Sequence, residues 1–250
     1  MVEVYYPYFQ KASRWEELRY SLRSVGLNLK EEFSVCIVGD LPEWCQNVTH
    51  IPHQRCEDMM ENQTFDAISK LQLFCQHLPQ QQGFMRMYDD IYLLQPVILK
   101  EIQVFKALYD WPGVDRQCYL TWNLQLIRSL EAVMAKGFHG WMTETHLPEY
   151  FEKDKMLFVI EDYHALENRL LTSTLYHNTY FPSEDPFMVS DDYATLFYDN
   201  RDEKNHKSSE GDLFLKCRNR LFMNHNDAGL NQNLKDFIQK SFPEKSRFEK

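Results

Sequence analysis

The sequence places two adjacent carboxylates, Asp89 and Asp90, where an apolar run from Phe84 to Tyr88 ends. Neighbouring side chains on an extended chain point to opposite faces, so one acid can bind a metal while the other orients a ligand. A Mg²⁺ or Mn²⁺ ion held by one or two carboxylates and completed by phosphates is a common arrangement in proteins. Asp is also frequent in turns and helix caps, and spacing alone favours that second interpretation.

Two later segments also carry side chains suited to chemistry. His146 precedes Leu147-Pro148, and an imidazole with an unperturbed pKa near 6.5 suits proton transfer at neutral pH. Its alternatives are a phosphate contact and the cap of a helix beginning at Pro148. Asn226 and Asp227 precede Ala228-Gly229, where Asp227 either contacts a metal or ligand or caps the helix that follows.

Arg218 and Arg220 lie two residues apart near the C-terminus. In an extended segment both guanidinium groups face the same side, where they can bind phosphate in a bidentate manner. An ordinary solvated basic stretch is an equally good interpretation. Several aromatic residues can stack on a ligand but are more often part of a core, so none is assigned individually. They are Trp111, Trp122, Trp141, Tyr176 and Tyr180.

The first hundred residues predict the elements that position the acidic pair. Strand patterns at 2–6, 33–38, 48–51 and 84–88 alternate with two helix patterns. The first helix begins at a Ser13/Glu16 capping box and ends at Gly26, and the second covers 64–78. This alternation predicts an open, mostly parallel α/β sheet, in which ligands bind at the carboxyl ends of the strands, where Asp89 and Asp90 lie.

The second half of the chain is less regular. Helical patterns cover 124–136, 148–155, 161–171 and 229–241, and the polar stretch 201–211 predicts a mobile loop. No clean linker interrupts the chain, so we expect a single domain over residues 1–250.

Composition excludes several classes of protein. With 27 basic and 37 acidic residues among 250, the net charge is -10, which disfavours general attraction to nucleic acid or to an anionic membrane. The six cysteines form no CxxC pair, so a reduced cytoplasmic protein is the simplest expectation. We find no segment with the pattern of a signal peptide or a membrane span. Any anionic ligand must then be held by local cations or a metal.

Several short motifs together resemble a known family. They are E-L-R-Y-S-L-R-S-V at 17–25, I-V-G-D-L-P-E-W at 37–44, Y-D-D-I-Y at 88–92, T-H-L-P at 145–148, N-H-N-D at 224–227 and F-P-E-K-S-R-F-E at 242–249. This set resembles the Stealth family of capsular-polysaccharide phosphotransferases and related bacterial and phage-borne sugar transferases.

The resemblance implies a GT-A-like, Rossmann-type nucleotide-diphospho-sugar transferase fold: a mostly parallel sheet flanked by helices, with an irregular helical C-terminal half. It also implies a metal-dependent transferase that moves a sugar or sugar 1-phosphate from a nucleotide-sugar donor to a glycan acceptor in surface polysaccharide synthesis. Residues 1–100 would bind the nucleotide sugar, and residues 101–250 would supply acceptor and catalytic groups. The implied location is the cytoplasm, with a peripheral place at the inner membrane left open.

The resemblance also implies roles for individual residues. Asp89 and Asp90 match the acids associated with a Mn or Mg ion, His146 matches the histidine of an H-x-P motif, and Asn226-Asp227 match a distal pair. The implied catalytic residues are His146, Asp90 and Asp227. The implied substrate-binding residues are Glu3, Arg19, Asp89, Arg218, Arg220 and Asn226.

Two positions depart from the family pattern: Glu3 stands for the usual acid of the first strand, and Tyr88 replaces the Asn that is typical before the acidic pair. These departures keep open a rival in which the chain binds a nucleotide sugar as an assembly subunit without turnover. A third and weaker alternative is a metal-dependent phosphohydrolase.

Overall fold

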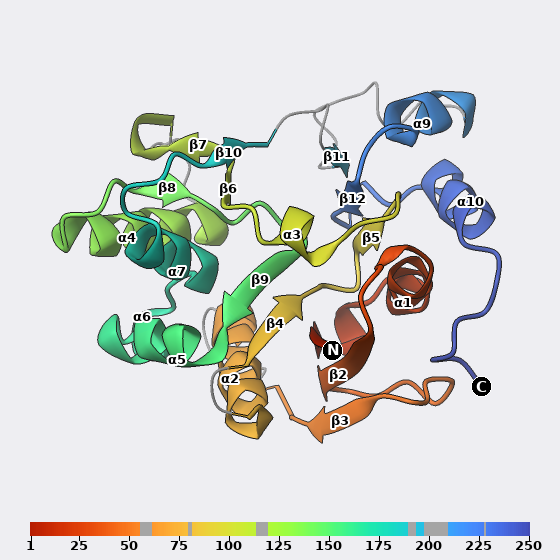
Figure 1. The fold of residues 1–250 in the computed structure, drawn as a ribbon, viewed down its shortest axis with the longest axis horizontal. Helices are drawn as coiled ribbons and strands as arrows, with labels where there is room; N and C mark the ends of the chain where they lie inside the picture. Colours follow the sequence, from red (N-terminus) through yellow and green to blue (C-terminus); the bar gives the residue numbers. More distant parts are fainter. Residues whose placement is uncertain (56–61, 80–81, 114–119, 190–193, 198–209, 228) are drawn as a thin grey trace.

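A five-stranded sheet forms the centre of the computed structural model (Figure 1), which describes residues 1–55, 62–79, 82–113, 120–189, 194–197, 210–227 and 229–250. The strand order is β3-β2-β1-β4-β9. The first four run parallel, and β9 is antiparallel to β4. The bounds are β1 (Val2–Tyr8), β2 (Phe33–Gly39), β3 (Thr49–Pro52), β4 (Gly83–Arg86) and β9 (Glu149–Glu152). The predicted mostly parallel α/β sheet is therefore confirmed.

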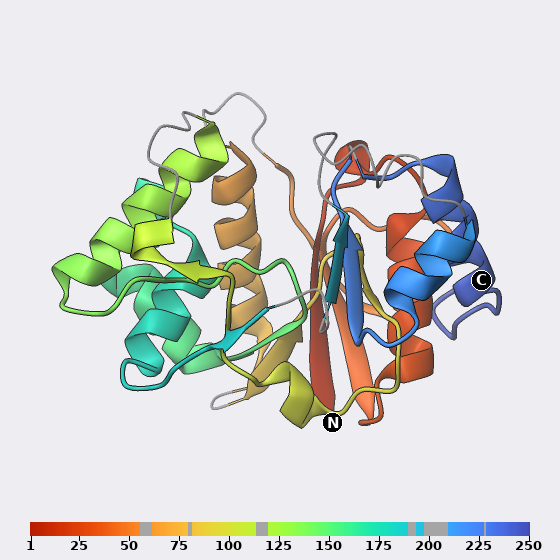
Figure 2. The same cartoon turned by 90° about the horizontal axis from the view of Figure 1, so that it is seen from above.

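Successive residues of β1 enter two different cores, because neighbouring side chains of a strand point to opposite faces. Val4 and Tyr6 pack on the side of α1 (Glu17–Asn28). Tyr5 packs on the other side against Phe74 of α2 (Asn62–His77), with ring centroids 4.4 Å apart. Figure 2 shows the sheet between α1 on one side and α2 with the α4 and α7 helices on the other. The central strand is thus covered on both faces.

The first helix differs from its prediction at both ends. Glu17 rather than Glu16 closes the N-terminus, accepting a hydrogen bond from the Ser13 hydroxyl at 2.6 Å. The helix continues through Gly26 to Asn28. The Asn28 side chain donates to the carbonyl of Leu93 at 2.6 Å. This tertiary contact stabilises the last turn of the helix, beyond Gly26, where the helix was expected to end.

A second, three-stranded sheet brings the C-terminal part of the chain beside the acidic pair. It consists of β5 (Ile91–Leu93), β12 (Phe222–His225) and β11 (Ala194–Phe197), in the order β11-β12-β5. β12 pairs antiparallel with β5 and parallel with β11. Since β5 directly follows Asp89 and Asp90 in sequence, this pairing sets the residues at the end of β12 next to the two acids.

The second half contains several helices, as predicted but with different bounds, and short strand ladders that were not predicted. The ladders are β6 (Lys106–Ala107) with β10 (Phe187–Met188), and β7 (Tyr109–Asp110) with β8 (Trp141–Met142). The helices are α3 (Leu99–Ile102), α4 (Thr121–Ala135), α5 (Lys153–Asp162), α6 (Ala165–Asn168), α7 (Thr172–Tyr180), α9 (Glu210–Cys217) and α10 (Gln232–Ser241). The described residues also include the 3₁₀ turns η1 (Gln10–Ala12) and η2 (Trp111–Gly113).

The helix predicted for 148–155 is wrong at its start. Residues Glu149–Glu152 form β9, in which Glu149 and Phe151 are buried in alternation. That period of two is typical of a strand, and α5 begins only at Lys153. Most of the predicted loop at 201–211 lies outside the described residues.

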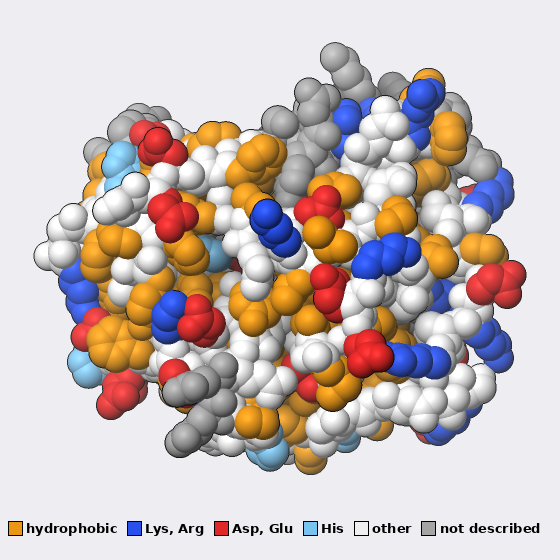
Figure 3. Space-filling view, viewed as in Figure 1, with side chains coloured by type: hydrophobic (Ala, Val, Ile, Leu, Met, Phe, Trp, Pro, Cys, Tyr) orange, Lys and Arg blue, Asp and Glu red, His pale blue; other side chains and the backbone are white. Residues whose placement is uncertain are grey.

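In the part of the chain that the structure describes, no helix has both the length and the apolar character needed to cross a membrane. Figure 3 shows one face of the molecule, on which acidic and basic side chains lie interspersed.

Candidate active site

Asp89 and Asp90 form the tip of a tight turn between β4 and β5, here called the acidic turn. The backbone N–H of Ile91 donates to the carbonyl of Tyr88 at 3.2 Å, which closes the turn. The turn follows β4 at the carboxyl edge of the parallel strands, where α/β sheets bind ligands. The turn and the ligand-site interpretations of this acidic pair are therefore compatible.

One face of α1 fastens the acidic turn and the strand that follows it. The Ser21 hydroxyl lies 2.6 Å from the carbonyl of Ile91 and 3.2 Å from that of Tyr88. One turn further along, Ser24 accepts a hydrogen bond from the Leu93 N–H at 3.1 Å. Both hydroxyls are fully buried. The two serines of the Y-S-L-R-S motif thus hold the backbone that carries the acids. This contact explains in physical terms why the motif has serine at these two positions.

Asp90 pairs with His146. The imidazole Nε2 lies 2.8 Å from the carboxylate Oδ1, and the Tyr88 ring stacks on the imidazole with centroids 5.0 Å apart. The Asn224 side chain donates to the His146 carbonyl. His146 has a φ of +52°, a left-handed conformation that costs a non-glycine residue about 1–3 kcal/mol and persists only where its surroundings fix it.

The end of β12 supplies the other polar groups. The backbone N–H of His225 lies 3.4 Å from the carbonyl of Asp90, and its Nε2 lies 3.1 Å from the hydroxyl of Tyr92. Asn226 follows directly and lines the same cavity as Asp90. Three distant segments, 88–90, 146 and 225–226, therefore meet at one point. Sequence reasoning selected His146 and Asn226 but missed His225, although it lies inside the N-H-N-D motif.

The two acids of the turn have different surroundings. Burial raises the pKa of Asp89, and repulsion from Asp90 and Glu17 adds to this, bringing the value to about 8. Burial would also raise the pKa of Asp90, but the neighbouring His146 outweighs it, so the pKa of Asp90 is lowered. For His146, burial lowers the pKa and Asp90 more than compensates, so its pKa is raised. The Asp90–His146 pair therefore favours a carboxylate beside an imidazolium.

A cavity of about 930 Å³, here called the main cavity, extends from Asp90 into the second half of the molecule. Its volume falls in the range of small-molecule sites. The end nearest the acidic turn, here called the polar end, is lined by Asp90, His146, His225, Asn226, Arg86, Tyr88, Glu144 and Glu149. The opposite end, here called the aromatic end, is lined by Leu108, Tyr109, Trp122 and Met142. One wall comes from α2 and another from the start of α4.

A buried ion pair underlies the polar end. Arg86 and Glu149 are each only 5% exposed at the side chain and form a salt bridge. Ser173 donates to the same carboxylate at 3.0 Å, and the Arg86 guanidinium lies 5.3 Å from the centre of the Tyr88 ring. Sequence reasoning missed this pair. The sequence did contain a signal for this ion pair: Arg86 lies inside an apolar strand, and a buried cation needs an anionic partner.

Other residues selected from the sequence lie away from the main cavity. Glu3 sits near the start of β1, opposite the carboxyl edge, beside Ser34. Asp227 is 66% exposed and pairs with Arg14 at 2.9 Å. Arg218 is exposed just after α9, and Arg220, which is partly buried, does not line the main cavity. Only Asp90, His146 and Asn226 of the selected residues line it.

Arg19 lies in a different pocket. Its guanidinium stacks on the Trp44 ring at 4.7 Å and pairs with Glu16. It lines a small cavity of about 210 Å³ together with Tyr8 and Trp15. This cavity lies at the end of β1, on the α1 side of the sheet. Glu17 of α1, which raises the pKa of Asp89, lies on the same side.

The acidic turn carries two carboxylates, the ligand type that hard divalent cations prefer, and of the two only Asp90 lines the main cavity. Among the residues the structure describes, no cluster of three or more His, Cys, Asp and Glu side chains is arranged as a closed metal site. Asp89 and Asp90 nevertheless place two carboxylates at one turn, and the charges of Asp90 and Glu17 raise the pKa of Asp89. Mg²⁺ is commonly bound by one or two carboxylates plus phosphates and waters, and the acidic turn supplies carboxylates.

Comparisons with known proteins identify the fold of this chain. No protein-family model matches the chain, and no curated protein matches it in sequence. The galactosyltransferase LgtC, solved with donor and acceptor sugar analogs, superposes with a TM-score of 0.51 at 9% identity, covering 99% of this chain and 98% of LgtC. An active-site mutant of LgtC gives a TM-score of 0.50 at 10% identity, with the same coverage.

The bifunctional glycosyltransferase WbbM, solved in the apo form, superposes with a TM-score of 0.54 at 8% identity, covering 98% of this chain and 50% of WbbM. The chain therefore has the GT-A fold of glycosyltransferases. The Stealth resemblance within that class stays a prediction from the sequence motifs.

Proposed function

We propose that this protein is a transferase that takes a nucleotide-activated sugar and moves the sugar, or the sugar 1-phosphate, to a glycan acceptor in surface polysaccharide synthesis. One observation carries the proposal. In a GT-A fold, Asp90, His146, His225 and Asn226 converge at the carboxyl edge of the parallel strands and line a cavity of about 930 Å³.

Asp89 and Asp90 are the residues that would hold a Mn or Mg ion, which when bound supplies Lewis-acid stabilisation of charge on phosphate oxygens. The protein's own groups do the rest. His146 is fixed by Asp90 at 2.8 Å and by the Tyr88 ring, so it offers one N–H at a defined place to a phosphate or an acceptor hydroxyl. The Asn226 amide lines the same end and is suited to orienting a sugar hydroxyl.

Tyr88, the departure from the family pattern, is part of this arrangement. Its ring lies between Arg86 at 5.3 Å and His146 at 5.0 Å. A Tyr ring covers the imidazole with a larger face than a small amide would, so Tyr88 gives His146 an aromatic support. This role favours a working site over the rival in which the chain is an assembly subunit without turnover.

Product analysis tests the proposal. Wild type is incubated with Mn²⁺, a panel of UDP-, GDP- and CDP-activated sugars, and a glycan acceptor mixture. Release of a nucleoside diphosphate indicates glycosyl transfer, and release of a monophosphate indicates the sugar-phosphate transfer expected from the Stealth resemblance. Tight donor binding with neither product supports the assembly subunit, and inorganic phosphate or sugar phosphate without any acceptor supports the phosphohydrolase.

Asp90→Asn is the matching variant, because the amide oxygen can still accept from His146 while the charge is removed. We expect turnover to fall about 10²- to 10³-fold, the usual loss when a preorganised electrostatic contact is removed. Asp236→Asn is the control, since Asp236 pairs with Gln232 on the surface of α10, away from the main cavity. Equal activity of wild type and Asp90→Asn would contradict the proposed site.

A further inference from the structure

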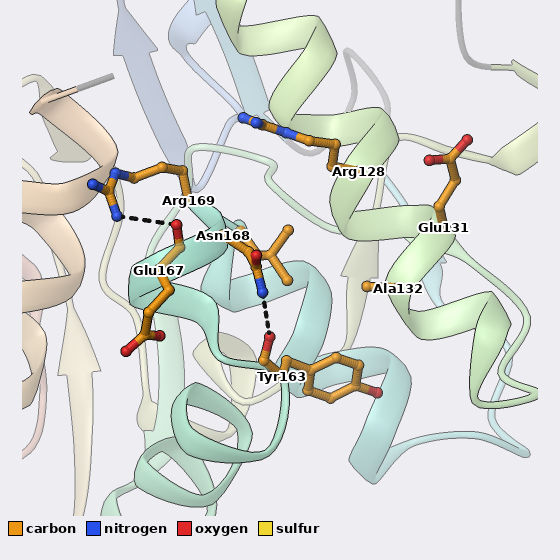
Figure 4. A pocket seen from close by; sticks show the side chains of 8 residues that line it. Arg128, Glu131, Ala132, Tyr163, Glu167, Asn168 and Arg169 are labelled. Carbon is orange, nitrogen blue, oxygen red and sulfur yellow. Dashed lines mark hydrogen bonds between the residues drawn. The ribbon is translucent and has the colours of Figure 1, made fainter. Parts of the chain in front are cut away.

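A second cavity, here called the outer cavity, lies between α4 on one side and α6 with the residues that flank it on the other. Its volume is about 530 Å³, again within the range of ligand sites. Figure 4 shows Arg128 and Glu131 projecting from α4, with Glu167, Asn168 and Arg169 on the other side. None of these residues lines the main cavity.

The two cavities are neighbours along one helix. Thr121 and Gln125 of α4 line the main cavity, and Arg128 and Ala132 of the same helix line the outer one. These residues are spaced by four, three and four positions, so they form one face of the helix. Leu170 lines both cavities. The two cavities therefore lie next to each other along one face of α4, with Leu170 common to their linings.

Arg169 connects the outer cavity to the opposite wall of the main cavity. Its guanidinium lies 4.5 Å from the centre of the Phe65 ring on α2, and the adjacent Thr64 lines the main cavity. Two backbone carbonyls, of Leu166 and Glu167, accept hydrogen bonds from the same guanidinium. The side chain is thus fixed at the boundary between the two cavities.

The lining of the outer cavity offers hydrogen-bond donors and acceptors in balance. Arg128 and Arg169 donate, Glu131 and Glu167 accept, and the Asn168 amide does both. Each sugar hydroxyl is at once a donor and an acceptor, so this mixture suits a polyhydroxylated ligand. The two positive and two negative charges offset each other, so the lining does not select for an anion.

We propose that the outer cavity is an acceptor subsite, which binds internal units of a neutral oligosaccharide whose reactive end lies in the main cavity. This subsite rests on the proposed function and specifies its acceptor. The acceptor is a chain of several sugars rather than a monosaccharide.

Binding without a donor tests this subsite. Wild type is titrated calorimetrically with neutral hexose and N-acetylhexosamine oligosaccharides of one to five units, and with uronic-acid oligosaccharides of the same lengths. We expect affinity in a neutral series to rise about tenfold with length and then level off, as one added hydrogen bond to a charged group would give.

A charge-neutral double variant locates the effect. Arg128→Ala with Glu131→Ala removes both charged side chains that α4 places in the outer cavity, together with their hydrogen-bonding groups, and leaves the net charge unchanged. We expect its affinity for the pentasaccharide to fall to that for the monosaccharide. The control, Lys100→Ala with Glu161→Ala, makes the same change at exposed helix positions that line neither cavity, and it should bind like wild type.

Several outcomes overturn the subsite. They are an affinity independent of length in every series, a length dependence confined to uronic-acid oligosaccharides, and a length dependence that the double variant leaves intact. The proposed function fails separately. Length-dependent binding without turnover of any nucleotide sugar keeps the subsite and removes the transferase, whereas turnover without length dependence does the reverse.

Discussion

The two ends of the main cavity are built in different ways. At the polar end, His146 is fixed by Asp90, by the Tyr88 ring and by the side chain of Asn224. At the aromatic end, Trp122 is 46% exposed and sits at the first turn of α4, on a wall completed by the two-residue strands β7 and β8. One end is held by strand termini and buried polar contacts, and the other is an open surface of a helix.

Under the proposed function, this difference separates two tasks of a transferase. A reacting group must be held in place before the reaction, because electrostatic stabilisation is effective only when it is preorganised. An acceptor can instead be held by contact area that adapts to it. Changes at the polar end should therefore affect stability and turnover together, whereas changes at the aromatic end should affect acceptor affinity alone.

The largest effect is expected from breaking the ion pair under the polar end. Arg86→Met leaves the Glu149 carboxylate buried without its cation, and loss of one partner of a buried pair costs about 3–5 kcal/mol. The free energy of unfolding, measured by urea denaturation, should fall by that amount. Arg86→Met with Glu149→Leu should recover much of the loss, because neither member of the pair is then left buried without the other. A double variant as unstable as the single one would contradict this account.

Lowering the pH should destabilise the native state through the same ion pair, within a defined pH range. Burial would raise the pKa of Glu149, but Arg86 and then His177 outweigh it and lower the value from 4.5 to about 2. A carboxyl with a lowered pKa stabilises the native state fully above pH 4.5, and this contribution is lost as the pH falls toward about 2. In urea titrations, stability should decline through this window, and Glu149→Gln should flatten the decline.

The smallest effect is expected at the aromatic end. Trp122→Ala removes an exposed ring, so Tm should stay near that of wild type. The KM for the acceptor should rise about tenfold with kcat retained, as expected for the loss of roughly 1.4 kcal/mol of apolar contact. Leu124→Ala is the control, because Leu124 is 40% exposed on the same helix and does not line the main cavity. A fall in kcat for Trp122→Ala would show that the two ends are not separable.

Local patterns predicted the first half of the fold well. Strands and helices alternate there, and apolar residues such as Leu18, Leu22 and Val25 repeat at the spacing of a buried helix face. In the second half, short elements take their form from distant partners. The residues after Pro148 have helical character, yet Glu149–Glu152 pair with β4 as an edge strand, and no local signal contains that pairing.

The sequence by itself determined the acidic turn and its place at the carboxyl edge of the sheet. An apolar strand that is followed directly by two acids sets both the position of the turn and the edge on which it lies, and all of this information is contained in a few adjacent residues. Only the tertiary structure decided which groups face them. His146 reaches Asp90 across 56 residues, His225 arrives through the pairing of β12 with β5, and Glu149 meets Arg86 across 63 residues. Hydrogen bonds and ion pairs form between whichever groups packing brings together, and packing is a property of the whole chain.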